Sequence, residues 1–229
     1  MDEVCGQYGQ YFVSFSGIDG AGKSTQIALL LKALQEAGLR TELITFWDDV
    51  VVLKRFREGA GHRVFKGDKG VGSPEAPIQR RDKNVQSRLL TFVRMAFYVL
   101  DVLSLRRIVK QAQKKDPEVA ANVLIFDRFI YDELANLNPK GIFTRLYMAL
   151  ILLLAPRPNV AFVLDAEPEK AFARKPEYPL EFLHFNRNSY LRLAGTAGLA
   201  IIAPASVQDA HTEVVRRMHQ SETALLASV

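Results

Sequence analysis

The sequence predicts an α/β fold in which five parallel strands form one sheet with helices on both faces. Two observations favour it: short apolar runs alternate with longer segments of helical spacing, and the first run leads directly into a glycine-rich loop. Alternation of this kind gives parallel strands, because each helix carries the chain back across a face of the sheet. The runs are residues 11–15, 41–46, 123–126, 160–164 and 199–203. We expect one domain, residues 1–229, since 229 residues suffice for a substantial core.

The first strand, residues 11–15, is followed by a loop with the pattern G-x-x-x-x-G-K-[ST]. Glycines let the loop backbone curl so that its N–H groups face phosphate oxygens, and the next helix adds its positive N-terminal end. The lysine of such a loop contacts the β- and γ-phosphates of a nucleotide, and the serine hydroxyl binds Mg²⁺. We therefore assign Lys23 and Ser24 to these two roles. The loop residues are Gly17, Ile18, Asp19, Gly20, Ala21, Gly22, Lys23, Ser24 and Thr25.

A chance match in an ordinary turn is the alternative interpretation of this loop. The segment that follows argues against it, because its apolar residues have the i, i+3, i+4, i+7 spacing of an amphipathic helix. These residues are Ile27, Leu30, Leu31 and Leu34, and Gly38 stands where the helix is expected to end. Strand, loop and helix together predict the three-layer α/β fold of P-loop NTPases, with ATP and Mg²⁺ as cofactors.

Between the second and third strands the sequence predicts an insert and a long helix. Residues 59–83 are rich in glycine and basic residues, which is typical of a flexible segment. The helix after them carries one apolar stripe, formed by Leu89, Phe92, Val93, Ala96, Val99, Leu100 and Leu103. Residues 148–155 are the most apolar stretch, but a membrane span needs about 20 apolar residues. We expect a buried helix end there and no membrane span.

The third strand ends in Asp127, Arg128 and Phe129. In open parallel sheets ligands bind at the carboxyl ends of the strands, so these residues are expected to face the phosphate loop. Asp127 suits Mg²⁺ binding through water, as a Walker-B-type aspartate does, and Arg128 suits a position that spans the donor and acceptor phosphates. A surface Asp–Arg pair that ends the strand is the alternative.

Composition limits the choice of partner and compartment. The net charge of +5 is compatible with nucleic acid, an anionic membrane surface or small phosphorylated substrates. The phosphate loop makes the third explanation sufficient, and few aromatic residues accompany the basic ones, so a nucleic-acid partner is not expected. The single cysteine, Cys5, excludes an internal disulfide. With no signal peptide before the first strand, we expect a cytoplasmic protein.

These motifs resemble those of thymidylate kinases, nucleoside monophosphate kinases with a P-loop. The resemblance covers the phosphate loop at 16–25, the Asp-Arg-aromatic motif at 127–129, and the segments 164–174 and 203–218. It implies transfer of the γ-phosphoryl of ATP to a small acceptor, a nucleoside monophosphate such as dTMP. It also implies that Asp19 lies near the sugar 3′-hydroxyl, Arg128 on the transferred phosphate and Arg174 at the base of a short lid, about residues 174–187. From the resemblance alone we expect a possible homodimer.

In some thymidylate kinases an arginine follows the acidic residue of the loop, whereas Gly20 stands there in this chain. The transition-state cation is therefore expected from the lid, with Arg174 and Lys175 as candidates ahead of Arg187. After the second strand, where the family has an arginine for the acceptor phosphate, this chain has Asp48 and Asp49.

On the long helix, Asp101 stands one turn after Phe97, where the family has an arginine. Arg94, Phe97 and Tyr98 are candidate acceptor contacts, and an ordinary solvated helix face is the alternative.

These departures leave two further functions open. In a kinase whose acceptor offers a hydroxyl, Asp48 or Asp49 would act as the general base, as a carboxylate at the end of the second strand does in deoxynucleoside kinases. The competing role for Asp48 is the N-cap of a helix over residues 50–56. The other function is a regulatory protein that binds ATP without turnover.

Overall fold

The computed structural model describes residues 10–52, 88–115, 122–137 and 141–227. Within these residues five strands form one parallel sheet in the order β2-β3-β1-β4-β5. The predicted α/β class and the parallel sheet are therefore confirmed. β1 is central, so the residues after it lie between those that follow β3 and those that follow β4. The strands are β1 (Tyr11–Ser16), β2 (Thr41–Thr45), β3 (Val123–Asp127), β4 (Val160–Leu164) and β5 (Ala200–Ile202).

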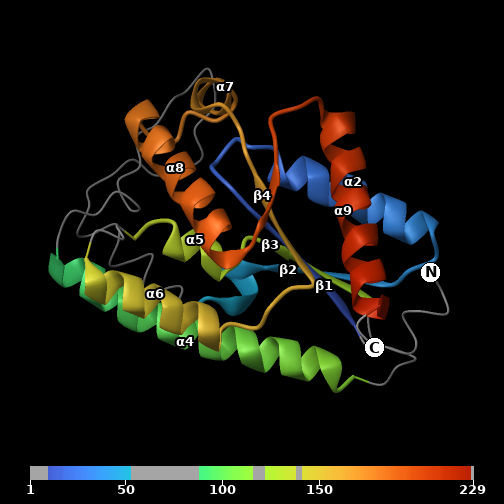
Figure 1. Ribbon diagram of the computed structural model, residues 1–229, viewed down its shortest axis with the longest axis horizontal. Coiled ribbons are helices and arrows are strands. Elements are labelled where there is room, and N and C mark those ends of the chain that lie inside the picture. The colour runs from blue at the N-terminus through green and yellow to red at the C-terminus, as the bar shows by residue number, and fades with distance from the viewer. Residues whose placement is uncertain (1–9, 53–87, 116–121, 138–140, 228–229) are drawn as a thin grey trace.

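Helices cover both faces of this sheet (Figure 1). α2 and α9 lie together over one face, while α4, α5, α6 and α8 lie over the other. The alternation of strand side chains explains the two layers: Phe12 belongs to the core under α4 and α8, whereas Val13 and Phe15 pack under α2 and α9. The helices are α2 (Lys23–Glu36), α4 (Arg88–Gln113), α5 (Ile130–Leu134), α6 (Ile142–Leu154), α7 (Pro168–Arg174), α8 (Leu180–Ala197) and α9 (Val207–Ala227).

After β2 the chain makes one π-helical turn, η1 (Phe46–Val50). The turn closes with the Val51 N–H donating to the Phe46 carbonyl at 3.0 Å. Asp48 and Asp49 lie within this turn. Of the helix proposed over 50–56, Val51 and Val52 are not helical and residues 53–56 lie outside the described part of the chain. The predicted flexible insert, residues 59–83, also lies outside it.

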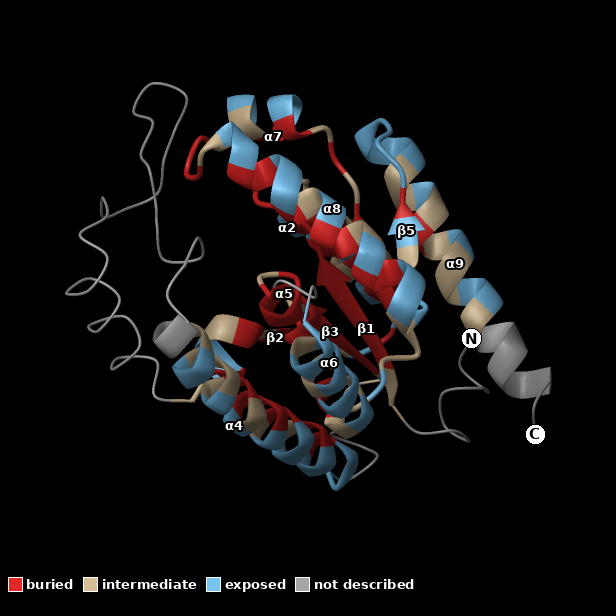
Figure 2. Cartoon of the chain, turned by 60° about the vertical axis from the view of Figure 1, so that its left-hand side comes forward, coloured by how far each residue is buried: buried red, intermediate tan, exposed pale blue. Residues whose placement is uncertain are grey.

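Most of the apolar stripe predicted on the long helix α4 lies at the surface, although Val99 packs against the core. Phe92, Leu100 and Leu103 are 75%, 41% and 51% exposed, while the buried face carries Tyr98, Asp101 and further apolar residues toward the C-terminus. The neighbouring α6 exposes a similar face (Figure 2). We call the exposed side chains of these two helices the α4–α6 apolar surface; they are Phe92, Val93, Leu100, Leu103, Ile142, Phe143, Leu146, Leu150 and Leu153.

The expectation of a buried helix end at 148–155 is wrong for three of its residues, Ala149, Leu150 and Leu153. Ile151 and Ala155 are buried, but Leu150 and Leu153 are 48% and 70% exposed. The strongly apolar composition of α6 therefore reflects an exposed apolar face in addition to a buried one. None of the helices in the described ranges is both long enough and apolar enough to cross a membrane.

Candidate functional site

The phosphate loop lies between β1 and α2 and approaches two other segments very closely. Gly17 has φ +140° and Gly20 has φ +83°. A Cβ on Gly17 would lie 2.5 Å from the Leu164 carbonyl oxygen, and one on Gly20 would lie 2.5 Å from the Ala171 carbonyl oxygen. Real Cβ atoms do not approach so closely, so both the backbone conformation and the packing require glycine here. The loop is thus held against the end of β4 and against α7.

Lys23, the first residue of α2, points back into the loop. Its side chain is buried, and its ammonium group donates to the carbonyl oxygens of Gly17 at 2.7 Å and Ile18 at 2.9 Å. Ser24 and Thr25 are exposed at the start of the helix. A buried ammonium, an exposed hydroxyl and a glycine backbone at a helix N-terminus form a set that fits a nucleotide phosphate chain with its Mg²⁺.

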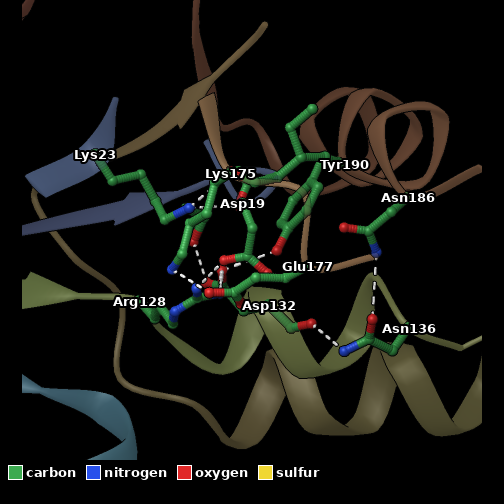
Figure 3. Close-up of polar contacts among 12 residues, drawn as sticks. Asp19, Lys23, Arg128, Asp132, Asn136, Lys175, Glu177, Asn186 and Tyr190 are labelled. Carbon is green, nitrogen blue, oxygen red and sulfur yellow. Dashed lines mark hydrogen bonds and ion pairs between the residues drawn. The ribbon is translucent and has the colours of Figure 1, made fainter. Parts of the chain in front are cut away.

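Arg128 follows β3 and faces the phosphate loop. It has φ +67°, and among the described residues no other non-glycine residue has a positive φ. Its guanidinium forms an ion pair with Asp19 of the loop and lies 3.6 Å from an oxygen of Asp132 (Figure 3). Burial alone lowers the pKa of Arg128, but the carboxylates of Asp19 and Asp132 outweigh it and raise the pKa above the ordinary value. The guanidinium is therefore a permanent cation beside the loop.

Asp132, on α5, is a buried carboxylate with several donors around it (Figure 3). One oxygen accepts the Ser16 hydroxyl at 2.6 Å and the Phe129 N–H at 3.0 Å. The other accepts the Tyr190 hydroxyl at 2.8 Å. Burial and the nearby Asp132 charge raise the pKa of Tyr190 well above its usual value, so this phenol remains a donor.

The lid candidates differ in their contacts. Arg187 binds Asp165 with two hydrogen bonds of 2.6 and 2.7 Å, which joins α8 to the end of β4. Lys175 forms an ion pair with the buried Glu177 at 3.1 Å. Arg174 is exposed at the end of α7, and its Nε donates to the Lys170 carbonyl at 3.1 Å. Of the three, Arg174 has its guanidinium at the surface near the loop.

A cavity of about 250 Å³ opens beside the phosphate loop. Its wall comes from the start of α2, from α7 and from the turn between β5 and α9. Gln26 is buried in this wall and donates to the Val207 carbonyl at 2.9 Å, and Arg174 also lines the cavity. Its position next to the loop suits the nucleoside part of a nucleotide whose phosphates lie in the loop.

The remaining sequence-predicted residues lie toward the β2–η1 turn and α4. Asp49 accepts the Thr45 N–H at 2.7 Å, whereas Asp48 is exposed on the same turn. Tyr98 has no exposed surface and belongs to the core. Arg94 and Phe97 are half-buried on α4.

Two more predicted residues are placed by the structure. Asp101 is fully buried and accepts the Val52 N–H at 2.9 Å, so it anchors the chain that leaves η1. Asp127 is the last residue of β3 and pairs in register with Phe15 of β1 and Thr45 of β2. It therefore lies at the carboxyl edge of the sheet, as the predicted Mg²⁺ role requires.

Comparisons with known proteins agree on one group. The sequence matches no protein-family model. It is 24% identical to a probable thymidylate kinase of Archaeoglobus fulgidus, over 88% of this chain and 91% of that protein. It is 29% identical to a probable thymidylate kinase of Pyrococcus abyssi, over 90% and 94%. The chain is therefore similar to proteins named probable thymidylate kinase over about nine tenths of its length.

Two solved structures share the fold of this chain. The thymidylate kinase of Ehrlichia chaffeensis superposes with a TM-score of 0.57 at 22% identity, covering 92% of this chain and 99% of that one. The thymidylate kinase of Candida albicans gives a TM-score of 0.59 at 14% identity, covering 93% of both chains. At these identities the structures show the fold alone, and the predicted α/β architecture with a five-stranded parallel sheet is confirmed.

Sequence reasoning missed the group around Asp132. Ser16 and Tyr190 lie 116 and 58 residues from Asp132, so no local pattern links them. One local signal was present: Asp132 stands only four residues after Arg128, so the short turn between β3 and α5 can bring the two side chains together. An acidic residue at that offset from a site arginine is a candidate for contact with it.

Proposed function

We propose that this protein transfers the γ-phosphoryl group of Mg-ATP to a nucleoside monophosphate such as dTMP. The observation that carries the proposal is the ion pair between Asp19 of the phosphate loop and Arg128 after β3. It supports the proposal because Arg128 is a permanent cation beside the loop, where we propose that a donor phosphate meets an acceptor. Similarity to probable thymidylate kinases over about nine tenths of the chain supports the same function.

In this proposal the chain acts mainly by position and charge. Loop N–H groups and Lys23 would bind the β- and γ-phosphates, and Ser24 and Asp127 would hold Mg²⁺, which would supply positive charge beside the phosphate oxygens. Arg128 turns from Asp19 to the transferred group. An acceptor phosphate oxygen forms the new bond to the γ-phosphorus while the bond to the β–γ bridging oxygen breaks, and ADP leaves with that oxygen.

Arg174 is our candidate for the additional cation in the transition state. Arg187 is held by Asp165 and Lys175 by Glu177, whereas the Arg174 guanidinium lies at the surface on the wall of the cavity beside the loop. Arg174→Ala is expected to lower kcat more than the affinity for ATP.

A second candidate function is phosphorylation of a hydroxyl acceptor. Two carboxylates, Asp19 and Asp132, share the charge of Arg128, and the buried Asp101 stands on α4 where an arginine was expected. An acceptor without a phosphate would be repelled less by these carboxylates than a nucleoside monophosphate would be. Asp48, exposed after β2, would then be the general base, with Asp49 engaged at the Thr45 N–H.

The test is ADP release from Mg-ATP in a coupled assay with dTMP, other nucleoside monophosphates, free nucleosides and small hydroxyl compounds, with Lys23→Ala as the inactive control. Turnover with a monophosphate supports the first function. Turnover only with hydroxyl acceptors, abolished by Asp48→Asn, replaces it with the second. ATP binding without turnover on any acceptor would identify a regulatory ATP-binding protein.

We also propose that the protein forms a homodimer through the α4–α6 apolar surface. Large exposed apolar patches are uncommon on monomers and mark interaction sites. Phe143 and Leu153 of this surface are 83% and 70% exposed. Sedimentation analysis is expected to give a dimer, and Phe143→Glu with Leu153→Glu a monomer. Phe185→Glu, on α8 outside this surface, is the matched control; a monomeric unsubstituted protein would refute the proposal.

A further inference from the structure

A single buried carboxylate joins the segments that carry the candidate site. Asp132 is 4% exposed, and its hydrogen-bond donors come from two distant parts of the chain and from the N-cap of its own helix, α5. Ser16 ends β1 immediately before the phosphate loop, Phe129 lies in the turn after β3, and Tyr190 is in α8, the helix that follows the lid segment. Asp132 thus fixes these three segments relative to one another.

The same carboxylate faces Arg128. The Oδ1 atom that accepts the Tyr190 hydroxyl lies 3.6 Å from Nη1 of Arg128, while Nη2 pairs with Asp19. The two ends of the guanidinium are therefore held by two different carboxylates. Asp19 belongs to the phosphate loop, and Asp132 belongs to the first turn of α5.

The two carboxylates differ in what they can do during turnover. Asp19 is part of the loop that binds the donor, so its contact with Arg128 must be given up when the guanidinium turns to a phosphate. Asp132 is fixed by donors from Ser16, Phe129 and Tyr190 and stays in place. It is the anchor that remains for an arginine whose own backbone has the uncommon φ of +67°.

We propose that Asp132 is a positioning residue that holds one end of the Arg128 guanidinium, so that its other end exchanges between Asp19 and the transferred phosphate. The proposal rests on the proposed phosphotransferase function. A carboxylate is required, because both of its oxygens accept and its charge attracts the guanidinium. In Asp132→Asn the NH₂ group of the amide would face hydrogen-bond donors on one side. Arg128 would also lose the negative charge that Asp132 holds beside it.

The test is a double-mutant cycle of Asp132→Asn and Arg128→Ala, with kcat and the equilibrium affinity for ATP measured for each variant. Asp132→Asn is expected to lower kcat at least tenfold while the ATP affinity changes less than threefold. In the Arg128→Ala background the same substitution is expected to change kcat less than twofold. Additive effects in the two backgrounds would overturn the proposal, because a merely structural role does not depend on Arg128.

The matched control is Glu133→Gln. Glu133 is the next residue of α5 and is equally buried, at 2% exposure, but its charge acts on the phenol of Tyr147 and helps to raise the pKa of that group. This variant is expected to keep kcat within twofold. A loss as large as that of Asp132→Asn would mean that any buried charge lost from α5 has the same effect, and would overturn the proposal.

Two additional measurements keep the outcome decidable. If Asp132→Asn does not fold, Tyr190→Phe replaces it in the cycle, because it removes the donor that fixes the oxygen facing Arg128; additive effects again overturn the proposal.

If the unsubstituted protein turns over no acceptor, the proposed function fails, and NMR of the Arg128 guanidinium then tests the positioning role of Asp132. Hindered rotation that is lost in Asp132→Asn supports the positioning role, and equal rotation in both proteins overturns it.

Discussion

Gly20→Ala tests how rigidly the phosphate loop is packed against α7. The alanine must adopt φ +83°, which costs about 1–2 kcal/mol for a residue with a Cβ. Its Cβ would also lie 2.5 Å from the Ala171 carbonyl oxygen, and relieving such an overlap costs about 1–3 kcal/mol. Together the two effects predict a loss of about 2–5 kcal/mol in the free energy of unfolding.

Gly38→Ala is the matched control. Gly38 has φ +77° but no atom within 4 Å of its Cβ position, so it should lose about 1–2 kcal/mol from conformation alone. Both substitutions reduce the entropy of the unfolded chain equally, so their difference isolates the overlap. Urea unfolding followed by circular dichroism measures both losses. Equal losses would refute the reasoning, because they would mean that α7 moves away from the loop at no cost.

Three further predictions concern individual side chains. Lys23→Ala is expected to abolish ADP release while the unfolding transition remains cooperative; undiminished turnover would remove the phosphate-loop assignment. Arg187→Ala removes two charge-assisted hydrogen bonds to Asp165 and is expected to cost about 1–2 kcal/mol in urea unfolding, with an unchanged midpoint as the contrary result. Burial raises the pKa of Tyr131 to about 12, whereas a tyrosine in the unfolded chain titrates near 10. As the pH rises from about 10 to 12, the tyrosine therefore loses its proton first in the unfolded state, and the free energy of unfolding falls. Tyr131→Phe should make the free energy of unfolding depend less on pH in this range, and an equal slope in both proteins would contradict the prediction.

The sheet and the phosphate loop could be predicted because their signals are local. β4 was predicted with its observed bounds, and β1, β2, β3 and β5 within one residue at each end. Strand alternation and the spacing of Gly17, Gly22 and Lys23 are properties of a few consecutive residues. The roles of Ser24 and Asp127 in binding Mg²⁺, and of Arg94, Phe97 and Tyr98 in binding the acceptor, stay predictions.

The rest of the site depends on contacts between distant parts of the chain. Ser16, Asp132 and Tyr190 meet because β1 and α8 both pack against α5, and no local pattern contains that information. The apolar stripe of α4 shows a different limit. Periodicity identifies an apolar helix face, but it cannot say whether the face packs against the sheet or, as Phe92 does, lies at the surface.

When a nucleotide binds, the Lys23 ammonium group exchanges one set of hydrogen-bond acceptors for another. In the structure its ammonium group already donates to the carbonyls of Gly17 and Ile18. A phosphate chain entering the loop replaces these two acceptors, so the number of hydrogen bonds made by Lys23 need not rise. The favourable free energy must then come from the stronger attraction between the ammonium and an anionic oxygen, relative to a neutral carbonyl. Because Lys23 is buried, salt screens this attraction less than it screens an ion pair at the surface, so the nucleotide affinity should fall only modestly as salt is added.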